Sequence, residues 1–159
     1  IEKAIKELND YAREVEQKTK LLVSNLTDLG ADIARVKIVS LGAIYSGELL
    51  SSVSGYFSPL LNAGFVRVTN DHAAFVEFGT GVQGDGPTYP DAEILAKASW
   101  EYGIGEHIFA TKDGKIGWFY PTDDGSFRFT EGMMPRPFMY ETAIELERQY
   151  KQIAKEVFA

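Results

Sequence analysis

The sequence predicts an α+β fold in which two long helices pack on a small antiparallel sheet. Apolar residues recur every three or four positions at both ends of the chain, a pattern typical of amphipathic helices. Between these ends, short apolar runs alternate with turn-forming residues, a pattern typical of antiparallel strands. The chain has 159 residues, of which 45% are hydrophobic, and this size suits one domain. We therefore expect residues 1–159 to form a single domain.

The first helix is expected over residues 1–46. Gly30 lies within it and favours a bend there. A helix of this length would span roughly 65–70 Å, which exceeds the diameter of a compact domain of this size. Its apolar seam advances in alternating steps of four and three residues, the spacing of a heptad repeat, through Ile1, Ile5, Leu8, Ala12, Val15, Thr19, Leu22, Leu26, Leu29, Ile33 and Val36.

The excess length of this helix indicates a contact with another chain. We expect its second half to be buried on its own domain, as in an ordinary amphipathic helix. We expect its first half to pack on copies of the same protein. The residues expected at that contact are Ile5, Leu8, Ala12, Val15 and Leu22.

Residues 53–81 predict a β-hairpin followed by a short helix. The hairpin strands are expected at 53–57 and 63–69, on either side of Pro59 and Asn62. The alternation of apolar and polar residues in the second strand indicates a sheet with one covered face.

The short helix is expected to carry Phe75 and Phe78 on one face. Asn70 or Asp71 can cap its start, and Gly79 can close it in the left-handed conformation. The same residues could form a strand, but we favour the helix because a cap and a glycine bracket it.

Residues 82–131 predict a loop, a third helix and an aromatic β-meander. Glycines and prolines crowd the loop from Gly79 to Pro90. Asp91 can cap the helix, which Gly103 and Gly105 would end. The meander strands are expected at residues 107–110, 116–120 and 127–129, joined by Asp-Gly turns.

The last helix is expected over residues 137–158, with Pro137 in its first turn. Its seam has the same period as that of the first helix, so the two helices can lie side by side at a shallow angle. We expect them to cover the sheet together. The seam residues are Met139, Ala143, Leu146, Tyr150, Ile153 and Val157.

The composition argues against several kinds of function. The net charge of −7 opposes tight binding of nucleic acid. The chain has no cysteine, which excludes disulfides and thiolate metal sites. No apolar run approaches the roughly 20 residues that a membrane span needs.

No catalytic constellation is evident in the sequence. The two histidines, His72 and His107, have no second ligand at helical or strand spacing. Gly79, Gly81 and Gly84 copy the letters of a dinucleotide fingerprint but do not open a helix. Acidic residues at 113, 123 and 124 are typical of turns rather than of a calcium site. We therefore expect no enzymatic activity, no cofactor and no metal ion.

Three segments of the chain resemble, in order, those of a known family. They are Ser46 to Val53, Val76 to Gly81, and Gly132 to Met139, which contains Pro-Arg-Pro-Phe-Met at the start of the last helix. Together they resemble the neck or tail-completion proteins of long-tailed bacteriophages, the gene-product-ten-like family of HK-type phages. The stretch at 82–131 is longer than in a minimal member of that family.

The resemblance implies a structural protein of the virion, assembled in the host cytoplasm. Its copies would form a ring around the DNA channel and contact the connector and tail-tube proteins, with DNA passing through the lumen without specific binding. One contact patch is expected on the first half of the long helix and another near the loop from Gly79 to Pro90. The residues implied in structure and assembly are Phe75, Glu77, Phe78, Gly79, Gly81, Arg136, Pro137 and Phe138. The alternative from the residues is a non-enzymatic cytoplasmic adaptor that dimerises through a coiled coil.

Glu77 stands out because it is a carboxylate within an apolar run. A buried charge needs a donor, since an unpaired one is very costly. The resemblance brings Arg136 into its neighbourhood, and an arginine can bind a carboxylate through two hydrogen bonds. The alternatives are that Glu77 is solvated or that it caps nearby backbone amides.

Overall fold

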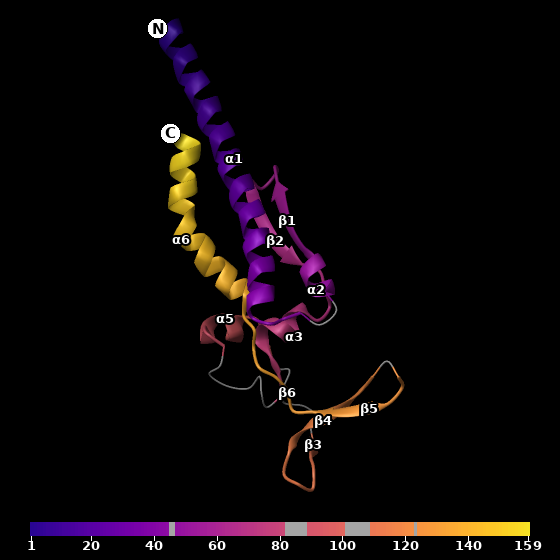
Figure 1. Ribbon diagram of the computed structural model, residues 1–159. Helices are drawn as coiled ribbons and strands as arrows, with labels where there is room; N and C mark the ends of the chain where they lie inside the picture. The colour runs from indigo at the N-terminus through magenta and orange to yellow at the C-terminus, as the bar shows by residue number, and fades with distance from the viewer. Residues whose placement is uncertain (45–46, 82–88, 101–108, 123) are drawn as a thin grey trace.

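The computed structural model describes residues 1–44, 47–81, 89–100, 109–122 and 124–159 (Figure 1). Within these residues, no helix is long and apolar enough to cross a membrane. The helices and short antiparallel sheets confirm the predicted α+β class. The elements in chain order are α1 (Glu2–Ser40), α2 (Glu48–Ser51), β1 (Val53–Ser58), β2 (Ala63–Val68), α3 (Ala73–Phe78), α5 (Ala92–Lys97), β3 (Phe109–Ala110), β4 (Ile116–Pro121), β5 (Phe127–Thr130), β6 (Gly132–Met133) and α6 (Phe138–Phe158).

The long helix α1 lies between two neighbours, the β1–β2 hairpin and α6 (Figure 1). The hairpin is antiparallel, as predicted, and α1 is tied to it by the Arg35 guanidinium, whose Nη2 donates to the Val53 carbonyl at 2.8 Å. α6 runs antiparallel along α1, where Lys37 and Glu141 form an ion pair at 3.2 Å. The expectation that both helices cover the sheet is therefore wrong in its layering, because α1 covers the hairpin and α6 packs along α1.

α1 continues through Gly30 without a break. A Cβ atom on Gly30 would lie 2.7 Å from Val66 Cγ2 and 2.9 Å from Leu146 Cδ1. Glycine therefore allows the hairpin and α6 to approach the same point of α1. The reason for a glycine here is close packing rather than bending.

The end of α1 differs from the predicted end near residue 46. Gly42 has φ +64°, its N–H donates to the Val39 carbonyl at 3.1 Å, and the Ala43 N–H donates to the Ile38 carbonyl at 2.9 Å. This is the Schellman arrangement, which satisfies the last carbonyls of a helix through a glycine in the left-handed conformation. The helix consequently ends at Ser40.

The most deeply buried residues of α1 lie to one side of the predicted seam, although the seam residue Ile33 is also buried. Val36, a predicted seam residue, has 63% of its surface exposed, whereas Ala34 and Ile38 are fully buried. Small residues on that face let the hairpin come close to the α1 backbone, which outweighs the preference for burying large side chains. The buried core consists of Ala31, Ala34, Ile38, Ala43, Leu49, Val53, Val76 and Phe138.

The strands β3, β4 and β5 form an antiparallel sheet that projects from the helical body (Figure 1). Phe109, Phe119 and Phe129 gather on one face with ring centroids 5.4–6.0 Å apart. The predicted turns are confirmed at Gly114 and Gly125, which have φ of +81° and +77°. Residues 107 and 108 of the predicted first strand lie outside the described residues.

The helix α5 begins as the sequence predicts. Asp91 Oδ1 accepts from the backbone N–H groups of Glu93 and Ile94, both at 2.9 Å. The helix ends at Lys97, and Ser99 has a positive φ of +50°. The end predicted at Gly103 and Gly105 is therefore wrong, because the chain leaves the helical conformation before residue 100.

Candidate functional site

The candidate site is the junction between α3 and the start of α6, where the second and third segments of the resemblance meet. The Asn70 side chain accepts from the His72 N–H at 2.9 Å and sets the turn that leads into α3. The predicted cap at Asn70 or Asp71 is wrong, because the N-cap residue is His72 and no side chain caps the helix. Gly79 ends the helix with φ +79° and ψ 177°. The short helix is thus confirmed over the strand, although Gly79 takes an extended conformation with positive φ instead of the left-handed helical one.

The segment after α3 pairs with the segment that leads into α6. Thr80 and Gly81 form antiparallel bridges with Met133 and Gly132, respectively. The backbone N–H of Arg136 donates to the Val76 carbonyl at 2.8 Å. Backbone hydrogen bonds therefore fix the start of α6 against α3.

Glycine is required at Gly79 for two reasons. Its positive φ is unfavourable for other residues, and a Cβ atom there would lie 2.8 Å from both the Met133 carbonyl and Pro135 Cδ. The close approach of the two segments thus depends on the absence of a side chain.

Glu77 occupies the centre of this junction with only 6% of its surface exposed. Its Oε2 accepts from the Met139 N–H at 2.9 Å, and its Oε1 accepts from the Tyr140 N–H at 3.1 Å and from the Tyr89 hydroxyl at 2.9 Å. The two amides belong to the first turn of α6, where N–H groups have no partner within the helix. The N-cap residue Pro137 has no side-chain acceptor, and Glu77 supplies one from a distant segment.

Burial raises the pKa of Glu77, and the hydrogen bonds from Met139, Tyr140 and Tyr89 oppose this rise. Burial, together with the nearby charge of Glu77, also raises the pKa of Tyr89. The Tyr89 hydroxyl therefore keeps its proton and remains a donor. The positive end of the α6 dipole adds to the stabilisation of the carboxylate.

The hypothesis that Arg136 pairs with Glu77 is wrong. Arg136 contributes its backbone N–H to Val76, and no ion pair links its guanidinium to Glu77 among the described residues. The amides of the α6 first turn already satisfy the carboxylate. Of the two alternatives, capping of backbone amides is the one observed, and solvation is not.

An aromatic cluster surrounds the junction. Phe75 and Phe78 share a face, as predicted, and both contact Trp100, at 5.4 and 5.5 Å between ring centroids. Tyr89 lies 5.1 Å from Phe78 and 6.0 Å from Tyr140. The Trp100 Nε1–H donates to the Gly79 carbonyl at 2.9 Å.

Among the predicted site residues, Phe138 is almost completely buried and belongs to the core. Sequence reasoning missed Tyr89, Trp100 and Tyr140, which complete the cluster. The available signal for Tyr89 and Trp100 was the high aromatic content between residues 57 and 138, but it does not indicate which rings converge.

The contacts of the junction support a structural role, in which Glu77 holds the start of α6 against α3. Every hydrogen-bonding atom of the Glu77 carboxylate is engaged. In the described ranges, no group of three or more histidine, cysteine, aspartate and glutamate side chains could hold a metal ion. His72 is exposed at the start of α3, and its ring centroid lies 6.1 Å from that of Phe75.

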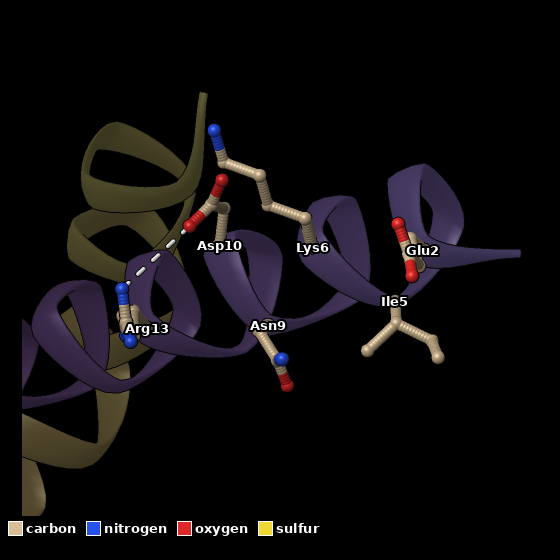
Figure 2. Close-up of a pocket in the computed structure, with 6 residues that line it drawn as sticks. All are labelled: Glu2, Ile5, Lys6, Asn9, Asp10 and Arg13. Atoms are coloured by element: carbon tan, nitrogen blue, oxygen red, sulfur yellow. Dashed lines mark ion pairs between the residues drawn. The ribbon is translucent and has the colours of Figure 1, made fainter.

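The predicted contact surface on α1 is a separate feature. Ile5 and Leu8 are 53% and 68% exposed, Ala12 is exposed, and Val15 and Leu22 are half-buried. A shallow hollow lies along the first turns (Figure 2), and only α1 residues line it: Glu2, Ile5, Lys6, Asn9, Asp10 and Arg13. A hollow on the flank of one helix is no enclosed ligand pocket.

Comparison with family models, curated proteins and solved structures found no match to this chain.

Proposed function

We propose that this chain is a structural component of the bacteriophage head–tail junction, whose copies form a ring around the DNA channel. The observation that carries the proposal is the apolar flank of α1 that the chain itself leaves uncovered. Ile1, Ile5, Leu8 and Tyr11 are all more than half exposed. A contiguous apolar surface of this kind marks an interaction site.

The junction supports the same proposal. The sequence segments that resemble the neck family are far apart in the chain, yet Gly81 and Gly132 form a bridge and Glu77 caps α6. Segments that hold each other in place would be retained together in a structural protein. The contact between these segments is a second observation, separate from the exposed apolar surface of α1.

The charge of the chain also suits a channel through which DNA slides. The net charge of −7 would repel the phosphate backbone instead of retaining it. The expected partners are the connector and the tail-tube proteins. The second predicted patch, near the loop from Gly79 to Pro90, falls largely on residues 82–88, outside the described residues.

Deletion of residues 1–22 tests the proposal. We expect the truncated protein to retain its fold, measured by circular dichroism, and to lose assembly, measured by light scattering and electron microscopy. The chain of residues 1–159 should form rings with a channel wide enough for duplex DNA. A dimer at every concentration would favour the coiled-coil adaptor, and assembly that survives the deletion would contradict the role of α1.

A further inference from the structure

The uncovered part of α1 lies beyond the end of α6. Pairing of Lys37 with Glu141 and of Gly30 with Leu146 shows that α6 runs antiparallel to α1. Counting on from these pairs places Phe158, the last residue of α6, at the level of about residue 19 of α1. The residues before this level, 1–18, are here called the overhang, and they extend beyond α6 for roughly 27 Å (Figure 1).

The overhang has one wide apolar face. At about 100° per residue, its apolar side chains fall within an arc of about 120°. All of its charged residues project outside this arc, and several form ion pairs along the helix, such as Lys18 with Glu14 at 3.1 Å. The apolar face consists of Ile1, Ala4, Ile5, Leu8, Tyr11, Ala12 and Val15.

This face continues the contact between α1 and α6. Gly30 and Lys37, which meet α6, project within the same arc when the helix is followed toward its C-terminus. The apolar face of the overhang therefore extends the surface of α1 that packs on α6, but α6 does not reach it. We expect a helix of another copy to pack on this face.

The breadth of the face indicates how many helices it contacts. A two-stranded coiled coil needs only the a and d positions of the heptad, whereas a helix in a larger bundle also has apolar residues at e or g. With Ile5 at a and Leu8 at d, Ala4 and Tyr11 occupy g positions. The face is thus wide enough for two neighbouring helices.

Charges at the edge of the face indicate the direction of those helices. A fully overlapping antiparallel pair would oppose Glu2 to the partner's Glu16, two like charges at e positions. A parallel pair in register places Glu16 beside the partner's Tyr11, which has a hydroxyl donor. Parallel packing is also what copies related by rotation about an axis along the helices require.

We propose that the overhangs of three or more copies of this chain pack as a parallel bundle in register, and that this bundle holds the assembly together. The proposal rests on the proposed function, because it names the partner of the apolar surface of α1. It excludes an antiparallel pair and a two-stranded coiled coil.

Single cysteines test the direction of packing, since residues 1–159 contain none. In a parallel bundle, Ile5→Cys meets itself in the neighbouring copy and forms a disulfide on mild oxidation. Asp10→Cys, on the opposite side of the helix, is the control and should remain reduced. A disulfide formed only between Ile5→Cys and Val15→Cys proteins in a mixture would overturn the proposal, because it requires antiparallel helices.

The number of copies is measured by light scattering over a range of concentrations. We expect at least three copies, and Leu8→Ser should raise the concentration needed for assembly about tenfold or more. Lys6→Ser should leave that concentration unchanged. Leu8 is 68% exposed in the single chain, so its replacement tests assembly without disturbing the fold.

The outcomes separate this inference from the proposed function. Rings with a DNA-sized channel but no disulfide at Ile5→Cys would overturn the bundle and leave the ring protein. A parallel bundle of three or more copies without such a channel would support the bundle and contradict the neck protein. A monomer or dimer at every concentration, with no disulfide, would overturn the bundle.

Discussion

The contribution of Glu77 to stability can be worked out from its contacts. Glu77→Ala removes the acceptor for the Met139 and Tyr140 amides and for the Tyr89 hydroxyl. Hydrogen bonds to charged groups contribute about 1.5–3 kcal/mol each, but loss of the buried charge relieves part of the desolvation cost. The loss of a helix cap alone costs about 0.5–2 kcal/mol. We expect a net loss of about 2–4 kcal/mol in the free energy of unfolding.

Urea denaturation followed by circular dichroism measures this change. Glu147→Ala, at an exposed position of α6, the helix that Glu77 caps, is the matched control and should change the free energy of unfolding by less than about 0.5 kcal/mol. Tyr89→Phe removes one of the three donors and should cost about 1 kcal/mol.

A loss of less than about 1 kcal/mol for Glu77→Ala would refute the reasoning, as would equal losses for Glu77→Ala and Glu147→Ala. Either result would mean that the α6 amides find other acceptors, such as water, when the carboxylate is absent. The junction would then be a consequence of the fold and not one of its supports.

Three further predictions concern the same fold. Gly132→Ala should destabilise the fold more than Gly125→Ala. Both glycines have positive φ, but of the two only Gly132 would place the new Cβ against a carbonyl oxygen, that of Thr80. The midpoints of urea denaturation measure the difference. Gly64→Ala should cost about 1–3 kcal/mol, since its Cβ would overlap the Thr27 hydroxyl, and Thr27→Ala should recover part of the loss in a double-mutant cycle. Because burial raises the pKa of Glu77, the folded chain binds more protons than the unfolded chain between its ordinary and raised pKa values. The free energy of unfolding should therefore fall as pH rises through that window, and Glu77→Gln should remove this slope in a pH series.

Local signals predicted much of the fold. The α3 helix follows from the Asn70 turn and Gly79, and the meander turns follow from Gly114 and Gly125, because each signal acts within a few residues. Gly42 carried an equally local signal for the end of α1. A longer helix was expected from the regular spacing of apolar residues, but the left-handed Gly42 ends α1 at Ser40.

The partners of Glu77 could not be read from the sequence in the same way. The charge and its apolar surroundings indicate that a donor is needed, but the donors are backbone amides, which every residue has. Tertiary pairing brings the start of α6 to the carboxylate, through the bridges of Thr80 with Met133 and of Gly81 with Gly132. The buried face of α1 was missed for a related reason, since small residues such as Ala34 mark close approach only once the neighbour is known.

The bridge between Gly81 and Gly132 also explains how the projecting meander can coexist with the helical body. The segment at 82–131 leaves and re-enters the body at adjacent residues, so its length has little effect on the geometry of α3 and α6. Replacing this segment by a two-residue Asn-Gly turn should therefore preserve the packing of α1, the hairpin and α6.

This replacement also removes Tyr89 and Trp100, which contact Glu77, Phe75 and Phe78. We expect a loss on the order of 3 kcal/mol from these contacts, with the helical signal per residue retained or increased in circular dichroism. The chain with residues 82–131 in place and carrying Tyr89→Phe serves as the reference for the lost hydrogen bond. A shortened chain that shows no cooperative unfolding would mean that the segment at 82–131 is part of the core. A shortened chain that folds would locate the core in α1, the hairpin and the junction between α3 and α6.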